Sequence, residues 1–154
     1  NTMAMNLQGI KSSVLIAPST FSAAGTAISN TVDCKGFEEL QLVLTKTTHS
    51  NDYITVFNIQ QSDSTNTSDF AAVTGYVAGT DWTLASLTSG TNAATEKAAG
   101  VFNIDLRGKK RYFRVLVTNG AVASGIALTA TLARAEQAPI TATGVNAGVV
   151  VNPS

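Results

Sequence analysis

Apolar and polar residues alternate with a period of two along much of this chain. In Glu39–Thr45, three leucines fall on one face of an extended strand and polar side chains fall on the other. In Tyr53–Ile59, the same rule places Tyr53, Thr55 and Phe57 on the buried face together with the final isoleucine. Half-buried antiparallel strands explain this pattern, because one face packs on a core and the other meets solvent. The clearest such segments are Glu39–Thr45, Tyr53–Ile59, Phe102–Leu106 and Ile126–Leu132.

Three further segments read as strands, namely Ser12–Ala17, Thr26–Asp33 and Arg111–Thr118. Val115–Val117 is apolar on both faces, which predicts a central strand. Only Ala93–Gly100 has a helical composition, closed by a glycine. Seven or eight strands in one chain predict an all-β fold, an antiparallel β-sandwich of jelly-roll or immunoglobulin-like topology. The pattern leaves the choice between these two topologies open.

The rhythm of the strands also predicts the organisation of the chain. Its 154 residues suit one domain. We expect an N-terminal arm at residues 1–11, a sandwich domain at 12–136 with a long loop region at 62–100, and a C-terminal tail at 137–154. The tail is apolar and carries no charged residue. We therefore expect it to lie against another surface, of its own domain or of a neighbour.

Charge and cysteine content exclude several classes of function. Charged residues make up 13% of the chain, against about 25% in typical domains, and the formal net charge is zero. There is no global attraction to nucleic acid or to an anionic membrane, and no apolar run long enough to cross a bilayer. Cys34 is the single cysteine, so it forms no disulfide within the chain. We expect it to be buried and inert.

No pattern typical of catalysis, cofactor binding or metal binding is present. His49 is the single histidine, and its polar surroundings predict a turn, since the glycine-flanked nucleophile of a Ser-His-Asp hydrolase is missing. No phosphate-binding glycine motif occurs. Asp63–Asp69 resembles a calcium loop but departs from it at Thr67, Ser68 and Thr74. The sequence thus predicts a protein that is not an enzyme and has no cofactor or metal.

The basic cluster at Arg107, Lys109, Lys110, Arg111 and Arg114 is the main concentration of charge. Arginine and lysine contact phosphate in nucleic-acid-binding proteins, but they also pair with acidic residues of other proteins. A net charge of zero and the lack of interleaved exposed aromatic residues favour contact with protein.

Three segments carry a resemblance to a known family: Thr31–Phe37 with the strand at Leu40–Leu44, Gln60–Ser64, and Phe102–Val115. Together they resemble the small virion proteins of tailed bacteriophages, of the head-decoration or cement type. The resemblance covers about residues 26–134 and consists of strand and turn motifs. It implies a β-sandwich on the capsid surface of a virion, bound to the major capsid protein and often trimeric, with no catalytic residues.

The expected contact elements are the N-terminal arm, the tail, the single tryptophan and the basic turn. Trp82 in its Gly- and Thr-rich loop is either a local core plug or an interface anchor. Two other functions stay open: a carbohydrate- or receptor-binding module of a fibre or lectin, and another neck or tail component. The candidate interface residues are Trp82, Arg107, Lys109, Lys110, Arg111, Val149, Val150 and Val151.

Overall fold

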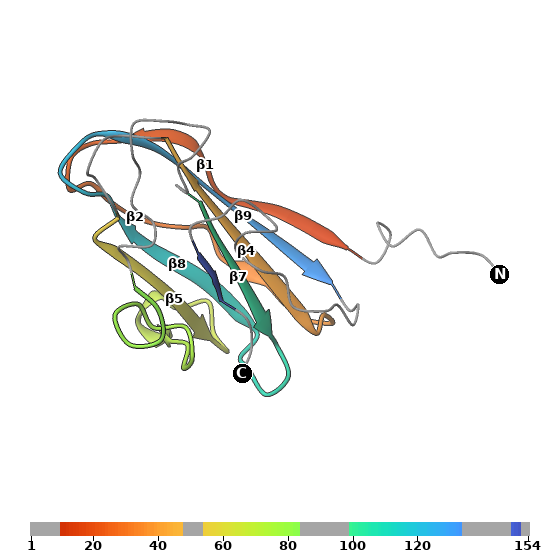
Figure 1. The fold of residues 1–154 in the computed structure, drawn as a ribbon. Helices are drawn as coiled ribbons and strands as arrows, with labels where there is room; N and C mark the ends of the chain where they lie inside the picture. The colour runs from red at the N-terminus through yellow and green to blue at the C-terminus, as the bar shows by residue number, and fades with distance from the viewer. Residues whose placement is uncertain (1–9, 48–53, 84–98, 134–148, 152–154) are drawn as a thin grey trace.

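A computed structural model describes residues 10–47, 54–83, 99–133 and 149–151. The described chain forms two stacked sheets with one short 3-10 helix, which confirms the predicted all-β sandwich (Figure 1). Its elements are β1 (Lys11–Phe21), β2 (Thr26–Ile28), β3 (Val32–Asp33), β4 (Glu39–Lys46), β5 (Val56–Ser62), η2 (Thr67–Asp69), β6 (Ala71–Ala72), β7 (Ala99–Asp105), β8 (Tyr112–Thr118), β9 (Ser124–Ala133) and β10 (Val149–Val151).

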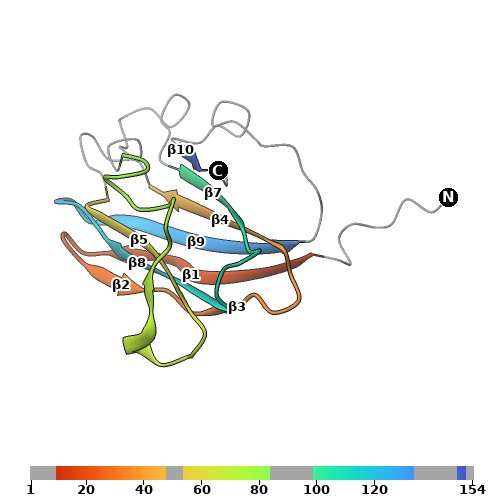
Figure 2. The same ribbon diagram turned by 90° about the horizontal axis from the view of Figure 1, so that it is seen from below.

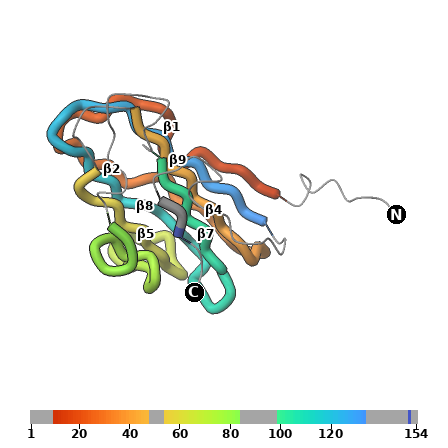
Figure 3. Tube along the Cα trace, in the orientation of Figure 1, coloured from red at the N-terminus to blue at the C-terminus, as the bar shows by residue number. Residues whose placement is uncertain are grey.

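The topology is that of a jelly roll. One sheet has the strand order β1-β9-β4-β7-β10, and the other has the order β2-β8-β5-β6 with β3 also on β8. The antiparallel pairs are nested: β5 with β6, β4 with β7, β2 and β3 with β8, and β1 with β9. This nesting describes one long hairpin rolled over itself, which decides between the two topologies that the sequence left open. β7 and β8 follow each other in the chain but belong to opposite sheets (Figure 3).

The core lies between the two inner faces, where the alternating residues meet. Leu40, Leu42 and Leu44 of β4 are at most 1% exposed, as their spacing predicts. The predicted inward residues of β7 and β9 are buried in the same way. Each large apolar side chain so buried contributes about 1.5–3 kcal/mol. Since the described chain has no disulfide and few ion pairs, this packing and the strand pairing hold the domain together.

The alternation predicted for Tyr53–Ile59 is wrong at Thr55. That residue lies in a bend and is exposed, whereas Ile54 is fully buried in its place. The Thr55 N–H donates to the carbonyl oxygen of Thr118 at 3.0 Å, which turns the chain before β5 begins at Val56. Phe57 and Ile59 face the core as predicted. Tyr53 is outside the described residues.

The strand predicted at Thr26–Asp33 is divided into β2 and β3 because Ser29 changes the pairing. Its N–H donates to the carbonyl oxygen of Val115 at 2.8 Å, and its Oγ accepts the Val115 N–H at 2.9 Å. The N–H of Asn30 then donates to Leu15, in the other sheet, at 3.0 Å. The chain at this point joins the edges of both sheets. Val115 itself lies in β8, between β2 and β5, so the predicted central strand is confirmed.

The two ends of the chain take part in the sandwich more than the sequence predicts. β1 begins at Lys11, inside the predicted arm. Val149–Val151 forms β10, parallel to β7 at the sheet edge, and Val151 packs on the core (Figure 2). This part of the tail therefore lies against its own domain, one of the two surfaces that the sequence allows for it. Residues 1–9 and 137–148 lie outside the described ranges.

The predicted helix at Ala93–Gly100 is wrong at its end, because Ala99 and Gly100 begin β7. The rest of that segment lies outside the described residues. Within the described ranges, no helix has the length and apolar character that crossing a membrane requires.

Candidate interaction site at the basic end of the sandwich

Three segments meet at one end of the sandwich, which we call the basic end: residues 34–38, residues 106–111, and residues 61–63 at the end of β5. Backbone hydrogen bonds hold the first two together, from the Cys34 N–H to the Arg111 oxygen at 2.9 Å and from the Leu106 N–H to the Glu38 oxygen at 2.8 Å. The Lys110 N–H donates to Oε1 of Gln61 at 3.1 Å. Segments distant in the sequence thus form one surface.

The segments 34–38 and 106–111 contain the same kind of turn. The N–H of Phe37 donates to the Cys34 oxygen at 3.1 Å with Gly36 at φ 86°, and the N–H of Lys109 donates to the Leu106 oxygen at 3.0 Å with Gly108 at φ 75°. A positive φ at the third position is the feature of a type II turn, and glycine adopts it without a steric cost. The turns fix the direction in which the neighbouring lysines leave the surface.

Arg111 and Asp33 form a two-pronged ion pair in this surface. Nε and Nη2 of Arg111 donate to the two carboxylate oxygens of Asp33 at 2.8 and 2.7 Å. The Arg111 hydrogen bonds lower the pKa of Asp33 to about 2, and the carboxylate in turn raises the pKa of Arg111. The guanidinium also lies 4.8 Å from the centre of the Tyr112 ring. Arg111 is therefore engaged within the chain.

Arg107 is engaged in the same way with Asp105. Its Nε donates to the carboxylate oxygens at 2.9 and 3.1 Å, and its Nη2 donates at 2.6 Å. These side-chain hydrogen bonds, followed by one from the Arg107 N–H, lower the pKa of Asp105 to about 2. The arginine side chain is 77% exposed and does not line the pocket described next.

A pocket of about 330 Å³ opens between the three segments of the basic end. The lysines in its lining form no ion pair with the described residues, whereas Asp63 accepts the Arg111 N–H at 3.2 Å. The pocket lining therefore carries more positive than negative charge. The residues that line it are Cys34, Lys35, Phe37, Asp63, Leu106, Lys109, Lys110 and Arg111.

Cys34 lies under this pocket as an inert thiol, as expected from the sequence. It is 5% exposed, and burial, followed by the negative charge of Asp33, raises its pKa to about 12. The thiol is protonated at neutral pH, so it is a poor nucleophile. Among the described residues, no group of three or more His, Cys, Asp or Glu side chains is placed to hold a metal ion.

The loop that resembles a calcium site has a different structure. Oγ of Ser62 accepts the Ser64 N–H, and Oγ of Ser64 accepts the Asn66 N–H, both at 3.0 Å. The loop then enters η2. Its short polar side chains form local turns, and its two aspartates have different partners. Asp63 accepts the Arg111 N–H, and Asp69 accepts a hydrogen bond from Oγ of Ser68 at 3.4 Å.

Trp82 packs against the core, which favours the core-plug alternative, and its expected role as a contact element stays a prediction. Its ring lies edge-on to Phe57 at 5.8 Å and to Phe102 at 5.1 Å, between the two sheets. Those two phenylalanines stack on each other at 4.8 Å. The indole Nε1–H donates to the Tyr76 oxygen at 3.1 Å. Only part of the ring remains exposed.

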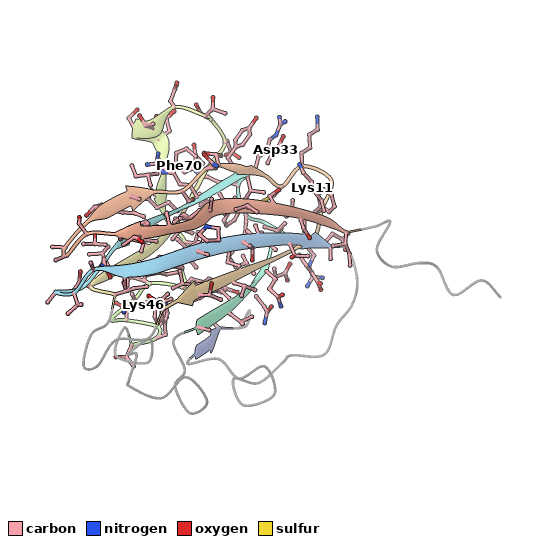
Figure 4. The ribbon with its side chains drawn as sticks, turned by 90° about the horizontal axis from the view of Figure 1, so that it is seen from above. Lys11, Asp33, Lys46 and Phe70 are labelled. Carbon is pink, nitrogen blue, oxygen red and sulfur yellow. The ribbon has the colours of Figure 1, made fainter. Side chains whose placement is uncertain are left out.

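Arg114 does not belong to the basic end, although the sequence groups it there. It is 8% exposed on the outer face of β8, where Nε donates to Oε1 of Gln60 at 2.8 Å and Nη2 donates to the Thr67 oxygen at 3.0 Å. Its guanidinium lies 4.1 Å from the centre of the Phe70 ring. Arg114 thus fastens the η2 loop to the sheet. Figure 4 shows Phe70 on that side, Asp33 and Lys11 at the basic end, and Lys46 toward the other end.

The structure brings together only part of the predicted interface set. Arg107, Lys109, Lys110 and Arg111 share the basic end, whereas Val149–Val151 pairs with Gly100–Phe102, along β7. Lys35, Phe37 and Asp63 complete the pocket but were not predicted. Lys35 follows a strand and precedes a glycine, which marks it as an exposed turn residue, but no local pattern connects it with the distant basic turn. His49 lies outside the described residues.

No protein-family model matches this chain, and no curated protein is significantly similar to it in sequence. Among solved structures, the chain is similar to the crystal structure of the PBSX exported protein XepA, with a TM-score of 0.52 and 16% identity. The match covers 90% of this chain and 42% of that one. This chain therefore spans about two fifths of the length of that protein. At this identity, the similarity shows a shared fold.

Proposed function

We propose that this chain is a structural protein of a phage particle, a decoration or cement protein that binds the assembled head. The observation that carries the proposal is the basic end, where lysines without ion pairs in the described chain surround an apolar floor on a rigid sandwich. The jelly roll supports it, because this fold is common in capsid proteins. The fold shared with XepA, a phage-related protein, and the resemblance of the basic turn to head-decoration proteins support it as well.

The proposed mechanism is thermodynamic. A protein that binds only the assembled shell stabilises that state by mass action, by about 2.7 kcal/mol per site when its free concentration is a hundred times the Kd. Contacts with several shell subunits at once make weak interactions collectively strong. Zero net charge lets copies crowd on a lattice without mutual repulsion. A trimer around a symmetry axis of the shell suits this mechanism.

The proposed function is binding and not catalysis. The described groups with shifted pKa values serve structural contacts: Asp33 and Asp105 hold arginines, and Cys34 is buried. Tyr76 donates to the Asn103 oxygen at 2.5 Å, and burial, followed by Asp105, raises its pKa to about 12. A sugar-binding function would need exposed aromatic rings, whereas Trp82 is packed on Phe57 and Phe102.

Co-sedimentation tests the proposal. The purified protein is mixed with assembled heads, with detached tails and with unassembled capsid subunits of the phage that encodes it. We expect saturable binding to heads alone. Binding to tails and not to heads would make the chain a tail component, and a specific hit on a glycan array without binding to heads would make it a carbohydrate-binding module.

A further inference from the structure

We propose that the pocket at the basic end binds an extended acidic peptide segment of a partner protein. One apolar side chain of the peptide occupies the floor, and flanking carboxylates pair with Lys35, Lys109 and Lys110. The identity of that partner as the shell protein rests on the proposed function. The acidic and apolar character of the peptide is inferred from the pocket alone.

The floor of the pocket is apolar. It is made by Cys34 and Leu106, which are 5% and 8% exposed, and by Phe37, which is half-buried against the core. Because the Cys34 thiol is protonated, it acts here as a small apolar group. The volume of about 330 Å³ is at the lower end of ligand pockets, which span about 300–1,000 Å³. This space suits one side chain and the adjoining backbone.

The rim supplies a limited positive charge. Lys35 and Lys110 are exposed and Lys109 is half-buried, and none of the three has an ion-pair partner among the described residues. Asp33 neutralises Arg111, and Asp63 adds one negative charge to the lining. This balance favours a few carboxylates over the dense charge of a nucleic-acid backbone. The Tyr112 ring faces Arg111, so it is not free to stack on a base.

The end segments of this chain do not supply the occupant. The end segments of this chain, residues 1–9 and 137–154, contain no Asp or Glu side chain. They therefore lack the charge that the three lysines would complement. A partner segment with acidic residues on both sides of an apolar one supplies both features of the pocket.

The walls of the pocket are fixed before any ligand arrives. The hydrogen bonds from Cys34 to Arg111 and from Leu106 to Glu38 join the two loops, and the glycine turns set their shape. A preorganised site loses little conformational entropy on binding, so the peptide alone bears the cost of ordering. A short peptide is therefore a sufficient probe.

Fluorescence anisotropy with the full chain tests this site. The probe is a fluorescein-labelled, end-capped peptide of sequence Glu-Asp-Leu-Asp-Glu, and we expect saturable binding that weakens with salt. The amide peptide Gln-Asn-Leu-Asn-Gln tests the charge, and Glu-Asp-Gly-Asp-Glu tests the apolar anchor; both should bind more weakly. The variant Lys109→Gln/Lys110→Gln should lose about tenfold in affinity, as expected for two partly exposed ion pairs.

Arg107→Gln is the matched control, because it removes one charge from the same turn but lies outside the pocket lining. It should keep most of the affinity, and all variants should keep the circular dichroism spectrum of the parent. Equal losses in both variants, or no saturable binding, would overturn the site. Tighter binding of a short oligothymidine than of the acidic peptide would replace it with a nucleic-acid site. Failure of the peptide with normal binding to heads would reject this inference and leave the proposed function standing.

Discussion

Arg111 and Asp33 join the first residue before β8 to the last residue of β3 through two hydrogen bonds of 2.8 and 2.7 Å. In the strand register, Asp33 is also opposite Tyr112, and the ring of Tyr112 lies under the same guanidinium. Its Oδ1 accepts the Lys35 N–H at 3.1 Å, at the start of the turn that carries the pocket. This one carboxylate therefore positions both walls of the basic end.

The Asp33 contact should make stability depend on pH. The pKa of Asp33 is lowered from 3.8 to about 2, so its contribution is complete above pH 3.8 and is lost as the pH falls toward about 2. Asp33→Asn should therefore lower the melting temperature at neutral pH, by a small amount because both side chains are about 40% exposed. The difference from the parent protein should shrink in acid.

Thermal unfolding followed by circular dichroism across a pH series measures this dependence. Asp69→Asn is the control, since Asp69 forms no ion pair with the described residues. The same melting temperature for Asp33→Asn and the parent at neutral pH would mean that the pair contributes no net stability.

Trp82 should be a stability residue. Replacing it with alanine removes its contacts with Phe57 and Phe102 and should cost about 2–4 kcal/mol of unfolding free energy, somewhat less than a fully buried tryptophan. Trp82→Phe keeps an aromatic ring but loses the hydrogen bond to Tyr76, so its cost should be smaller. Urea unfolding followed by circular dichroism gives both values. A Trp82→Ala protein of unchanged stability would place the ring outside the core.

Arg114 should hold the η2 loop in place. Arg114→Ala removes the hydrogen bonds to Gln60 and to the Thr67 oxygen and the contact with Phe70, and should cost about 1–3 kcal/mol. Limited proteolysis with chymotrypsin should then cut faster after Phe70. Arg107→Ala, a change of the same type at an exposed arginine, should leave that rate unchanged. Equal cleavage of all three proteins would contradict the role of Arg114.

Ala24 is the one described residue other than glycine with a positive φ, at 54°. An L-residue with a side chain is strained by about 1–2 kcal/mol in this region. Glycine relieves that strain, but it also raises the conformational entropy of the unfolded chain, which offsets part of the stabilisation. Ala24→Gly should therefore stabilise the protein by about 0.5–1 kcal/mol. Ala23→Gly, at a neighbouring position without a positive φ, should not stabilise it. Urea midpoints of the two variants make the comparison.

Removing β10 should weaken the fold. Truncation after Gly148 exposes the edge of β7 along Gly100–Phe102 and removes Val151 from the core. The melting temperature should fall, whereas truncation after Val151 should leave it unchanged. Equal stability of both truncated proteins would return Val149–Val151 to the role of a free contact element.

The strands were predictable because the alternation of side chains is a local property. Leu40, Leu42 and Leu44 show their buried face in the sequence itself. Thr55 was not predictable, because the bend that exposes it depends on Thr118, which is distant in the chain. The division at Ser29 has the same cause, a hydrogen bond to Val115 from another strand.

The basic end was predictable only in part. The turn at Arg107–Arg111 stands out as a charge cluster, but both of its arginines form ion pairs within the chain. The pair of Arg111 with Asp33 depends on tertiary structure, and the pair of Arg107 with Asp105 depends on a local turn. The pocket needs Lys35 and Asp63 from other loops. Nested strand pairing brings these loops together, and the sequence does not specify that nesting at the level of local patterns.

Under the proposed function, the chain strengthens an assembled phage head by binding to it. The most direct measurement is the temperature at which heads stripped of this protein release their DNA, followed with a DNA-binding dye while the purified protein is added back. The release temperature should rise with protein concentration and level off when the shell is saturated. Saturated binding with no change in the release temperature, or no binding to heads at any concentration, would mean that the chain is not a cement protein.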